Sequence, residues 1–241
     1  LLTMSTYLAV VWVLSRQTID PAVAERALAM GAIPVALLGV LNHFGVDPFG
    51  FYENLRAFDR SRFLSTLGNA DFYGSYLCIA FSAVLGWFVR SEKRWERTVS
   101  AFALVCVSFG ALVAGSDGTA LGLLVIALLF PALLFQDKRP LLRLWLAGAI
   151  FSLCSLLFGI LSRILPSSTY LSSFAQYLCS PVLSTALFAL FLLLWVLCHR
   201  TAAERLSLWK KPYLVTLAML ALLGTVALLL LNTSFRSVSL G

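Results

Sequence analysis

The chain has 241 residues, of which 60% are hydrophobic and 12% are charged, and its mean hydropathy is +0.91. Soluble domains are about 45–50% apolar and about 25% charged, so this composition excludes an ordinary soluble domain and indicates an integral membrane protein. The formal net charge is +7, but the placement of the basic residues argues against a nucleic-acid-binding surface. We expect an all-α polytopic helical bundle that forms a single transmembrane domain over 1–241.

A membrane-spanning helix needs about 20 mostly apolar residues. Eight segments meet or approach this length, and their continuous rather than alternating apolar pattern favours helices over barrel strands. In chain order the expected spans are 1–15, 27–43, 70–89, 98–115, 119–135, 141–162, 174–198 and 213–232. Internal prolines such as Pro181 are tolerated in membrane helices. The chain opens inside an apolar run, so we expect the N-terminal and central part of a longer membrane protein.

The loops between these spans fall into two alternating sets that differ in basic residues. The set 16–26, 90–97, 136–143 and 199–212 contains thirteen Lys and Arg, whereas the set 44–69, 116–118, 163–173 and 233–241 contains five. Basic residues are retained on the cytoplasmic side of a membrane. The first set is therefore predicted to be cytoplasmic and the second external, and the net charge mainly reflects topology.

The segment RFLSTLGNADFYGSYL (62–77) places polar residues at the external mouth of the third expected span. Arg62 begins this segment and Arg60 precedes it, and planar guanidinium groups suit phosphate oxygens. Gly68 would let the backbone approach an anion closely, and a helix N-terminus near Asn69 offers free N–H groups. Asp71 follows in the first turn. These residues form a candidate anion-binding mouth.

A structural interpretation of the same segment stays open. The loop carboxylates Asp47, Glu53 and Asp59 balance the loop arginines. Asn69 is a typical helix cap. Asp71 either suits the helix dipole or pairs with a neighbouring arginine.

Two further polar positions interrupt the apolar pattern at external turns. In AGSDGTALG (114–122), Asp117 follows Ser116 near membrane depth, where an ionisable residue is costly and is a candidate functional group. The alternative is a turn aspartate that caps a helix beginning at Thr119. Arg163 ends the sixth expected span, and a side chain that snorkels to the interface also explains it.

Metal and redox chemistry find no support in the residue spacing. The five cysteines lie in apolar segments without a CxxC pair and are interpreted as packing residues. His43 and His199 are isolated on different spans, without metal-ligand spacing. We expect no metal site and no cofactor.

The two polar motifs resemble a known family. STLGNADFYGSYL (65–77) resembles the "GT-hydrophobic-GNPN…YL" signature of the O-antigen ligase/O-antigen polymerase family. GSDGTALGLL (115–124) is similar to that family's Ser-Arg-Gly turn and the apolar helix after it, and SFRSVSLG (234–241) resembles the approach to its large external loop. The resemblance covers about 60–237. It departs from the family in two places, because Asn69-Ala70-Asp71 replaces Asn-Pro-Asn and Asp117 replaces the arginine expected to face the donor's phosphates.

The resemblance implies a membrane glycosyltransferase of cell-surface polysaccharide assembly at the external face of the bacterial cytoplasmic membrane. Its donor would be a polyprenyl-diphosphate-linked glycan and its acceptor a glycan or lipid, with no nucleotide sugar, metal or nucleic acid. The segment alone would be inactive, since part of the family's basic and histidine residues lie in the large external loop. A secondary transporter and a non-catalytic membrane scaffold are the alternatives. Asp117 is the candidate catalytic residue, and the candidate substrate contacts are Arg60, Arg62, Gly68, Asn69, Asp71, Ser116 and Arg163.

Overall fold

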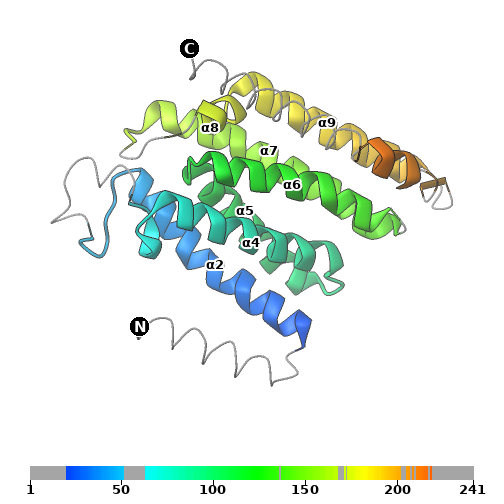
Figure 1. The fold of residues 1–241 in the computed structure, drawn as a ribbon, viewed down its shortest axis with the longest axis horizontal. Coiled ribbons are helices and arrows are strands. Elements are labelled where there is room, and N and C mark those ends of the chain that lie inside the picture. Colours follow the sequence, from blue (N-terminus) through cyan, green and yellow to red (C-terminus); the bar gives the residue numbers. More distant parts are fainter. Residues whose placement is uncertain are drawn as a thin grey trace, which may run out of the picture.

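A computed structural model describes residues 20–51, 63–135, 137–167, 171, 173–201, 205–206, 208, 210–216 and 218. Within these ranges the chain is helical and contains no strand (Figure 1). Six of the described helices are long and apolar enough to cross a membrane, which indicates an all-α membrane protein. They are α2 (Pro21–His43), α4 (Ala70–Arg90), α5 (Arg94–Val113), α6 (Asp117–Leu134), α7 (Lys138–Ile164) and α9 (Pro181–Arg200). Two short elements are η1 (Ser65–Leu67) and α8 (Ser173–Leu178), and residues 210–216 are also helical.

Five of the expected spans coincide with single long helices, and the expected span 174–198 does not. The expectation of one continuous span over 174–198 is wrong, because the chain breaks after α8 and starts again at α9. Pro181 is the first residue of α9, where its missing N–H costs nothing. The Ser180 side chain caps this helix by accepting a hydrogen bond from the Leu183 N–H at 3.3 Å. The expected span 1–15 lies outside the described residues, as does most of 213–232.

The helices pack as a bundle in which α4 and α5 are central. In each of these two helices 61% of the apolar window is buried, compared with 11% in α9. On one side α2 packs against α4 and α5, and on the other α7 packs against both and carries α9 on its outer face. The remaining long helix, α6, lies over α4 and α7.

One buried tyrosine joins the first three long helices near the start of α4. Tyr73 is fully buried, and its hydroxyl donates to the Ala36 carbonyl in α2 at 3.2 Å. Gly39 in α2 and Gly110 in α5 leave the space that this hydroxyl occupies, since a Cβ at either position would overlap it. The contact fixes the start of α4, and hence the segment before it, against both neighbours.

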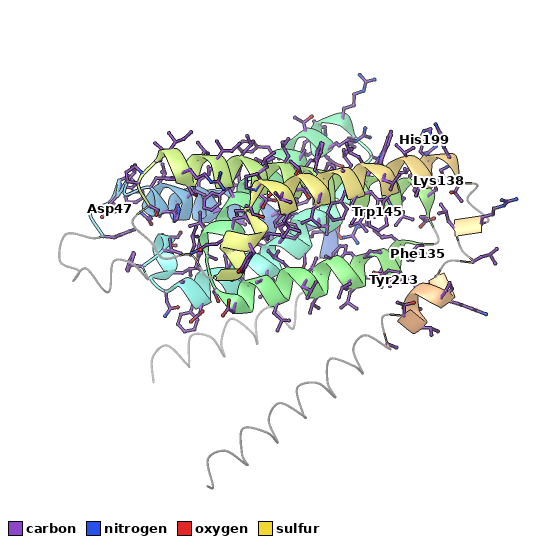
Figure 2. The ribbon with its side chains drawn as sticks, turned by 90° about the horizontal axis from the view of Figure 1, so that it is seen from above. Asp47, Phe135, Lys138, Trp145, His199 and Tyr213 are labelled. Carbon is purple, nitrogen blue, oxygen red and sulfur yellow. The ribbon has the colours of Figure 1, made fainter. Side chains whose placement is uncertain are left out.

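Successive long helices alternate in direction, so the loops gather at two opposite ends of the bundle (Figure 1). We call the end with 63–71 and 114–117 the motif end, and the end with 90–97 and 137–143 the basic end. Figure 2 shows Lys138 and His199 at the basic end and Asp47 at the opposite end. The structure thus places the described parts of the two loop sets at opposite ends, as the sequence predicts. Which set faces the cytoplasm stays a prediction.

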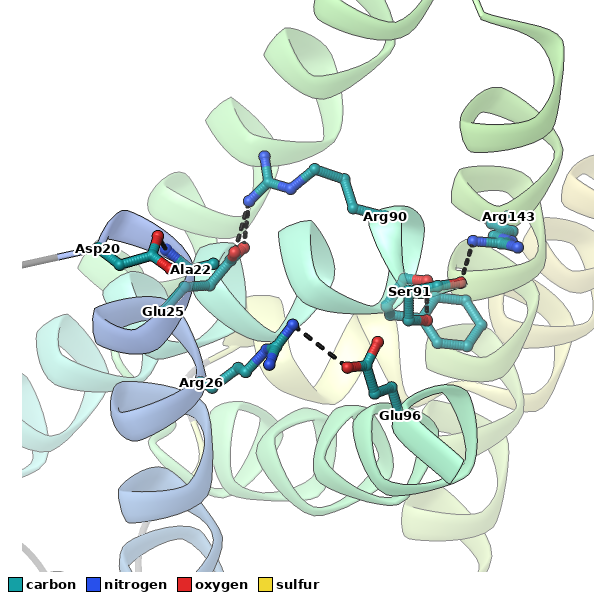
Figure 3. Close-up of polar contacts among 9 residues, drawn as sticks. Asp20, Ala22, Glu25, Arg26, Arg90, Ser91, Glu96 and Arg143 are labelled. Carbon is teal, nitrogen blue, oxygen red and sulfur yellow. Dashed lines mark hydrogen bonds and ion pairs between the residues drawn. The ribbon is translucent and has the colours of Figure 1, made fainter. Parts of the chain in front are cut away.

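Two ion pairs connect α2 to its neighbours at the basic end (Figure 3). Arg90 in α4 contacts both carboxylate oxygens of Glu25, at 2.5 and 2.6 Å. Arg26 pairs with Glu96 in α5 at 3.2 Å, and the Glu96 side chain is nearly buried. Exposed pairs contribute about 0–1 kcal/mol each. Loss of Arg26 would cost more than that, because it leaves a buried carboxylate without its cation.

Candidate functional site

The two sequence motifs meet at the motif end. The Ser116 hydroxyl, at the N-cap position of α6, donates a hydrogen bond of 2.8 Å to Oδ1 of Asp71, in the first turn of α4. The two residues are 45 positions apart in the chain. Asp71 is exposed and Ser116 is half-buried. The bundle therefore presents a carboxylate, held by a hydroxyl from another helix, at its surface.

The start of α4 owes its position to a turn and a cap. Gly68 has φ +68°, a left-handed conformation that glycine adopts without strain, and a Cβ there would lie 3.3 Å from the Phe63 ring. The Asn69 side chain accepts a hydrogen bond of 2.7 Å from the Asp71 N–H. This confirms the capping interpretation of Asn69. Gly68 and Asn69 thereby aim Asp71 outward at the beginning of the helix.

The start of α6 differs from its sequence-based expectation. The helix begins at Asp117, two residues earlier than Thr119, so Ser116 rather than Asp117 occupies the N-cap position. The expectation that Asp117 caps this helix is therefore wrong. Gly115, with φ +58°, makes the tight turn before it. The Ser116 hydroxyl donates to Asp71 and accepts no cap bond, so the first-turn N–H groups of α6 have no side-chain cap.

Small residues bring α6 close enough to α4 for this contact. Thr119 packs directly on Gly74, where a Cβ would overlap the threonine hydroxyl. The Cys78 thiol lies 3.5 Å from the Thr119 carbonyl oxygen, and Gly122 leaves room for the same thiol. Small residues allow close helix approach inside membranes. This seam sets the distance between Ser116 and Asp71.

Two buried hydrogen bonds of Ser65, which the sequence did not predict, form an anchor for the segment before α4. The Ser65 N–H donates to Oδ1 of Asn42 at 2.9 Å, and the Ser65 hydroxyl donates to the Val35 carbonyl at 2.8 Å. Both side chains are fully buried. Ser65 also has φ +57°, the single positive value among the described non-glycine residues. Such a conformation costs about 1–3 kcal/mol and persists only where surrounding contacts impose it.

This anchor ties the segment before Asp71 to the end of α2. The Asn42 side-chain amide donates to the Val46 carbonyl at 3.1 Å and so spans the turn after α2. The signal in the sequence was a polar Asn42–His43 pair at the end of an apolar run. Its partner 23 residues away could not be inferred from that pair.

The structure describes only one of the three remaining candidate residues. Arg60 and Arg62 lie outside the described residues. Arg163 is exposed near the end of α7 and forms no salt bridge with any described residue. Among the residues that the structure describes, no group of three His, Cys, Asp or Glu is placed to hold a metal ion. All five cysteines are free thiols.

The electrostatics of the site combine acids with helix N-termini. Asp71 and Asp117 each occupy the first turn of a long helix, where the dipole stabilises a carboxylate by about 0.3–1 kcal/mol. Both carboxylates are exposed to solvent. The uncapped N–H groups of α6 can donate to an anionic group beside them. The site thus offers a proton acceptor and hydrogen-bond donors within one small surface.

No protein-family model, no curated protein and no solved structure matches this chain.

Proposed function

We propose that this protein is a membrane glycan ligase or polymerase of the O-antigen ligase/polymerase type. It acts on a polyprenyl-diphosphate-linked oligosaccharide at the external face of the bacterial cytoplasmic membrane. The observation that carries the proposal is the hydrogen bond between Ser116 and Asp71. That bond joins the two segments on which the family resemblance rests, although they are far apart in the chain.

The chemistry requires displacement at an anomeric carbon with the lipid diphosphate as leaving group. The acceptor hydroxyl needs a general base, and Asp71, oriented by the Ser116 hydroxyl, is placed for that role. Asp117 is the second candidate base, in the first turn of the adjacent helix. In this proposal Asp71 takes the role first assigned to Asp117 alone.

The leaving diphosphate needs positive charge and hydrogen-bond donors. Arg60 and Arg62 of the preceding loop and Arg163 at the end of α7 supply the charge in this proposal. The uncapped N-terminus of α6 adds backbone donors. Two carboxylates would repel a diphosphate, so the arginines must lie between them and the phosphates in the donor complex.

The placement of ionisable side chains favours an enzyme at the membrane surface over a transporter. In the six long helices described, every Asp, Glu, Lys and Arg lies near a helix end. Secondary transporters place ionisable groups and broken helices near the bilayer midplane. The described helices provide a scaffold with polar chemistry at its ends.

The test uses the full-length protein in cells from which its gene has been deleted. We expect the deletion to cause accumulation of a polyprenyl-diphosphate-linked glycan and loss of the transferred polysaccharide, measured by lipid extraction and gel analysis. Wild-type protein should restore transfer, and Asp71→Asn should not. Asp137→Asn, which removes an exposed carboxylate at the basic end, is the matched control and should restore it. If the deletion leaves both the lipid-linked glycan and the polysaccharide unchanged, the proposal is wrong.

A further inference from the structure

A second polar site lies at the basic end, where no substrate contact was expected. A crevice of about 750 Å³ opens between the α4–α5 turn and the start of α7. Its lining contains five cations and two carboxylates, a net charge of +3. The charged lining residues are Arg90, Arg97, Lys138, Arg139, Arg143, Glu92 and Asp137.

Most of these cations have no carboxylate partner. Arg90 pairs with Glu25, outside the lining, and the two described salt bridges include neither Glu92 nor Asp137. The other four cations therefore lie more than 4.0 Å from any described carboxylate. They are Arg97, Lys138, Arg139 and Arg143.

Two of the four are held by the carbonyls of helix ends. Arg143 donates from one terminal nitrogen, Nη1, to the Val89 carbonyl at 3.0 Å. The same nitrogen donates to the Ser91 carbonyl at 2.5 Å (Figure 3). Lys138 donates to the carbonyls of His199 and Thr201, at 2.7 and 2.8 Å. These bonds fix both cations at the crevice wall. They leave the second terminal nitrogen and Nε of Arg143 available as donors.

Two like charges and one opposite charge surround Arg143. Arg97 and Arg139 both repel its charge, and Glu92 attracts it. Arg139 and Arg143 are four residues apart on α7, a spacing at which like charges destabilise a helix. Arg139 makes no hydrogen bond or ion pair with any described residue. Three guanidinium groups that converge on one crevice suit the oxygens of a phosphate group.

A separate apolar cavity lies on the same helices, nearer the middle of the bundle. It has a volume of about 90 Å³ and is lined from α4, α6, α7 and α9. On α4, Val89 of the crevice lies on the same helix face as Leu85 and Phe81 of the cavity, at intervals of four residues. On α7, Arg143 shares a face with Ala147 and Phe151 in the same way. The two sites thus follow one another along the same faces of α4 and α7, over about 12 Å of helix, and we call the pair the groove.

We propose that this groove binds one anionic phospholipid. Its phosphate lies among Arg97, Arg139 and Arg143, and one acyl chain enters the apolar cavity between α4 and α7. The site is separate from the motif end and does not depend on the proposed enzyme activity. A lipid is favoured over free phosphate because an apolar cavity lies next along the same faces of α4 and α7. Basic pockets between membrane helices are known sites for acidic headgroups.

The experiment measures lipid binding to the purified full-length protein in neutral detergent by native mass spectrometry. We expect one bound phosphatidylglycerol and no comparable binding of phosphatidylcholine with the same acyl chains. Arg97→Gln and Arg139→Gln should each weaken binding about fivefold, and the double variant about 25-fold. Lys93→Gln with Arg94→Gln removes two charges at the same end outside the crevice and should have little effect.

A second variant tests the acyl-chain part of the site. Ala127 is exposed on α6 and lines the cavity, so Ala127→Trp can fill the cavity from outside without disturbing a buried position. It should weaken phosphatidylglycerol binding, whereas Leu124→Trp, on the same helix but outside the cavity lining, should not. Equal binding of both lipids, or unchanged binding in the double arginine variant, would overturn the proposal. Displacement of the lipid by inorganic phosphate alone, with no effect of Ala127→Trp, would reduce it to a phosphate site and refute the lipid.

Discussion

Separate substitutions of Asp71 and Ser116 distinguish the chemistry of the candidate site from its geometry. Asp71→Asn keeps an oxygen that can accept the Ser116 hydroxyl bond, now 2.8 Å long, but it removes the negative charge and the proton acceptor. Ser116→Ala keeps the charge and removes the bond that orients it. The two variants therefore change different properties of one contact.

The expected magnitudes differ by more than a factor of ten. A general base contributes about 10²–10⁴-fold to a rate, so Asp71→Asn should lower glycan transfer at least about 100-fold. Its effect on folding is limited to the loss of a carboxylate in the first helical turn, about 0.3–1 kcal/mol. Ser116→Ala loses one hydrogen bond to an exposed carboxylate, which water replaces. We expect about 1 kcal/mol of stability and a three- to tenfold loss of transfer.

The assay is glycan transfer by the full-length protein in isolated membranes, normalised to the amount of folded protein found by fluorescence-detected gel filtration. Ser116→Thr restores a hydroxyl and should recover most of the activity lost in Ser116→Ala. Retention of more than a tenth of wild-type transfer by Asp71→Asn would refute the role of Asp71 as a base. It would leave the Ser116 bond as a purely structural link between α4 and α6.

Four other outcomes are expected. Asp117→Asn should leave expression unchanged, because Ser116 rather than Asp117 occupies the N-cap position. Unchanged glycan transfer by this variant would show that Asp117 is only a residue of the first helical turn. Arg62→Ala should reduce transfer about 10- to 150-fold through loss of a charge-assisted phosphate contact, while membrane insertion measured by fractionation stays normal. In single-cysteine variants of a cysteine-free protein, an impermeant maleimide added outside cells should label Asn54→Cys but not Lys93→Cys, and the reverse pattern would invert the topology. Gly110→Ala should destabilise the bundle by about 1–3 kcal/mol, because its Cβ would lie 2.8 Å from the Tyr73 hydroxyl; Gly31→Ala, 4.0 Å from the nearest side-chain atom, is the thermal-unfolding control.

The amino-acid sequence by itself determined the helical class and the separation of the loops. Continuous apolar runs of about 20 residues predict membrane helices, and five such runs coincide with single long helices. The alternating basic and non-basic loops predict two chemically different ends, and the described helices place them at opposite ends. Asn69 as a helix cap also followed from local chemistry. All of these features depend on residues that are close together in the chain.

The tertiary structure decided which distant residues meet. Neither motif alone indicates that Ser116 holds Asp71, because that contact depends on how closely α6 approaches α4 at Gly74 and Gly122. The same applies to Ser65, whose left-handed backbone is imposed by Asn42 and the Val35 carbonyl. The basic crevice also could not be inferred from the sequence. Its arginines were interpreted only as topology signals, and only the packing of α4 and α5 against α7 brings Arg97, Arg139 and Arg143 together without a salt-bridge partner among the described residues.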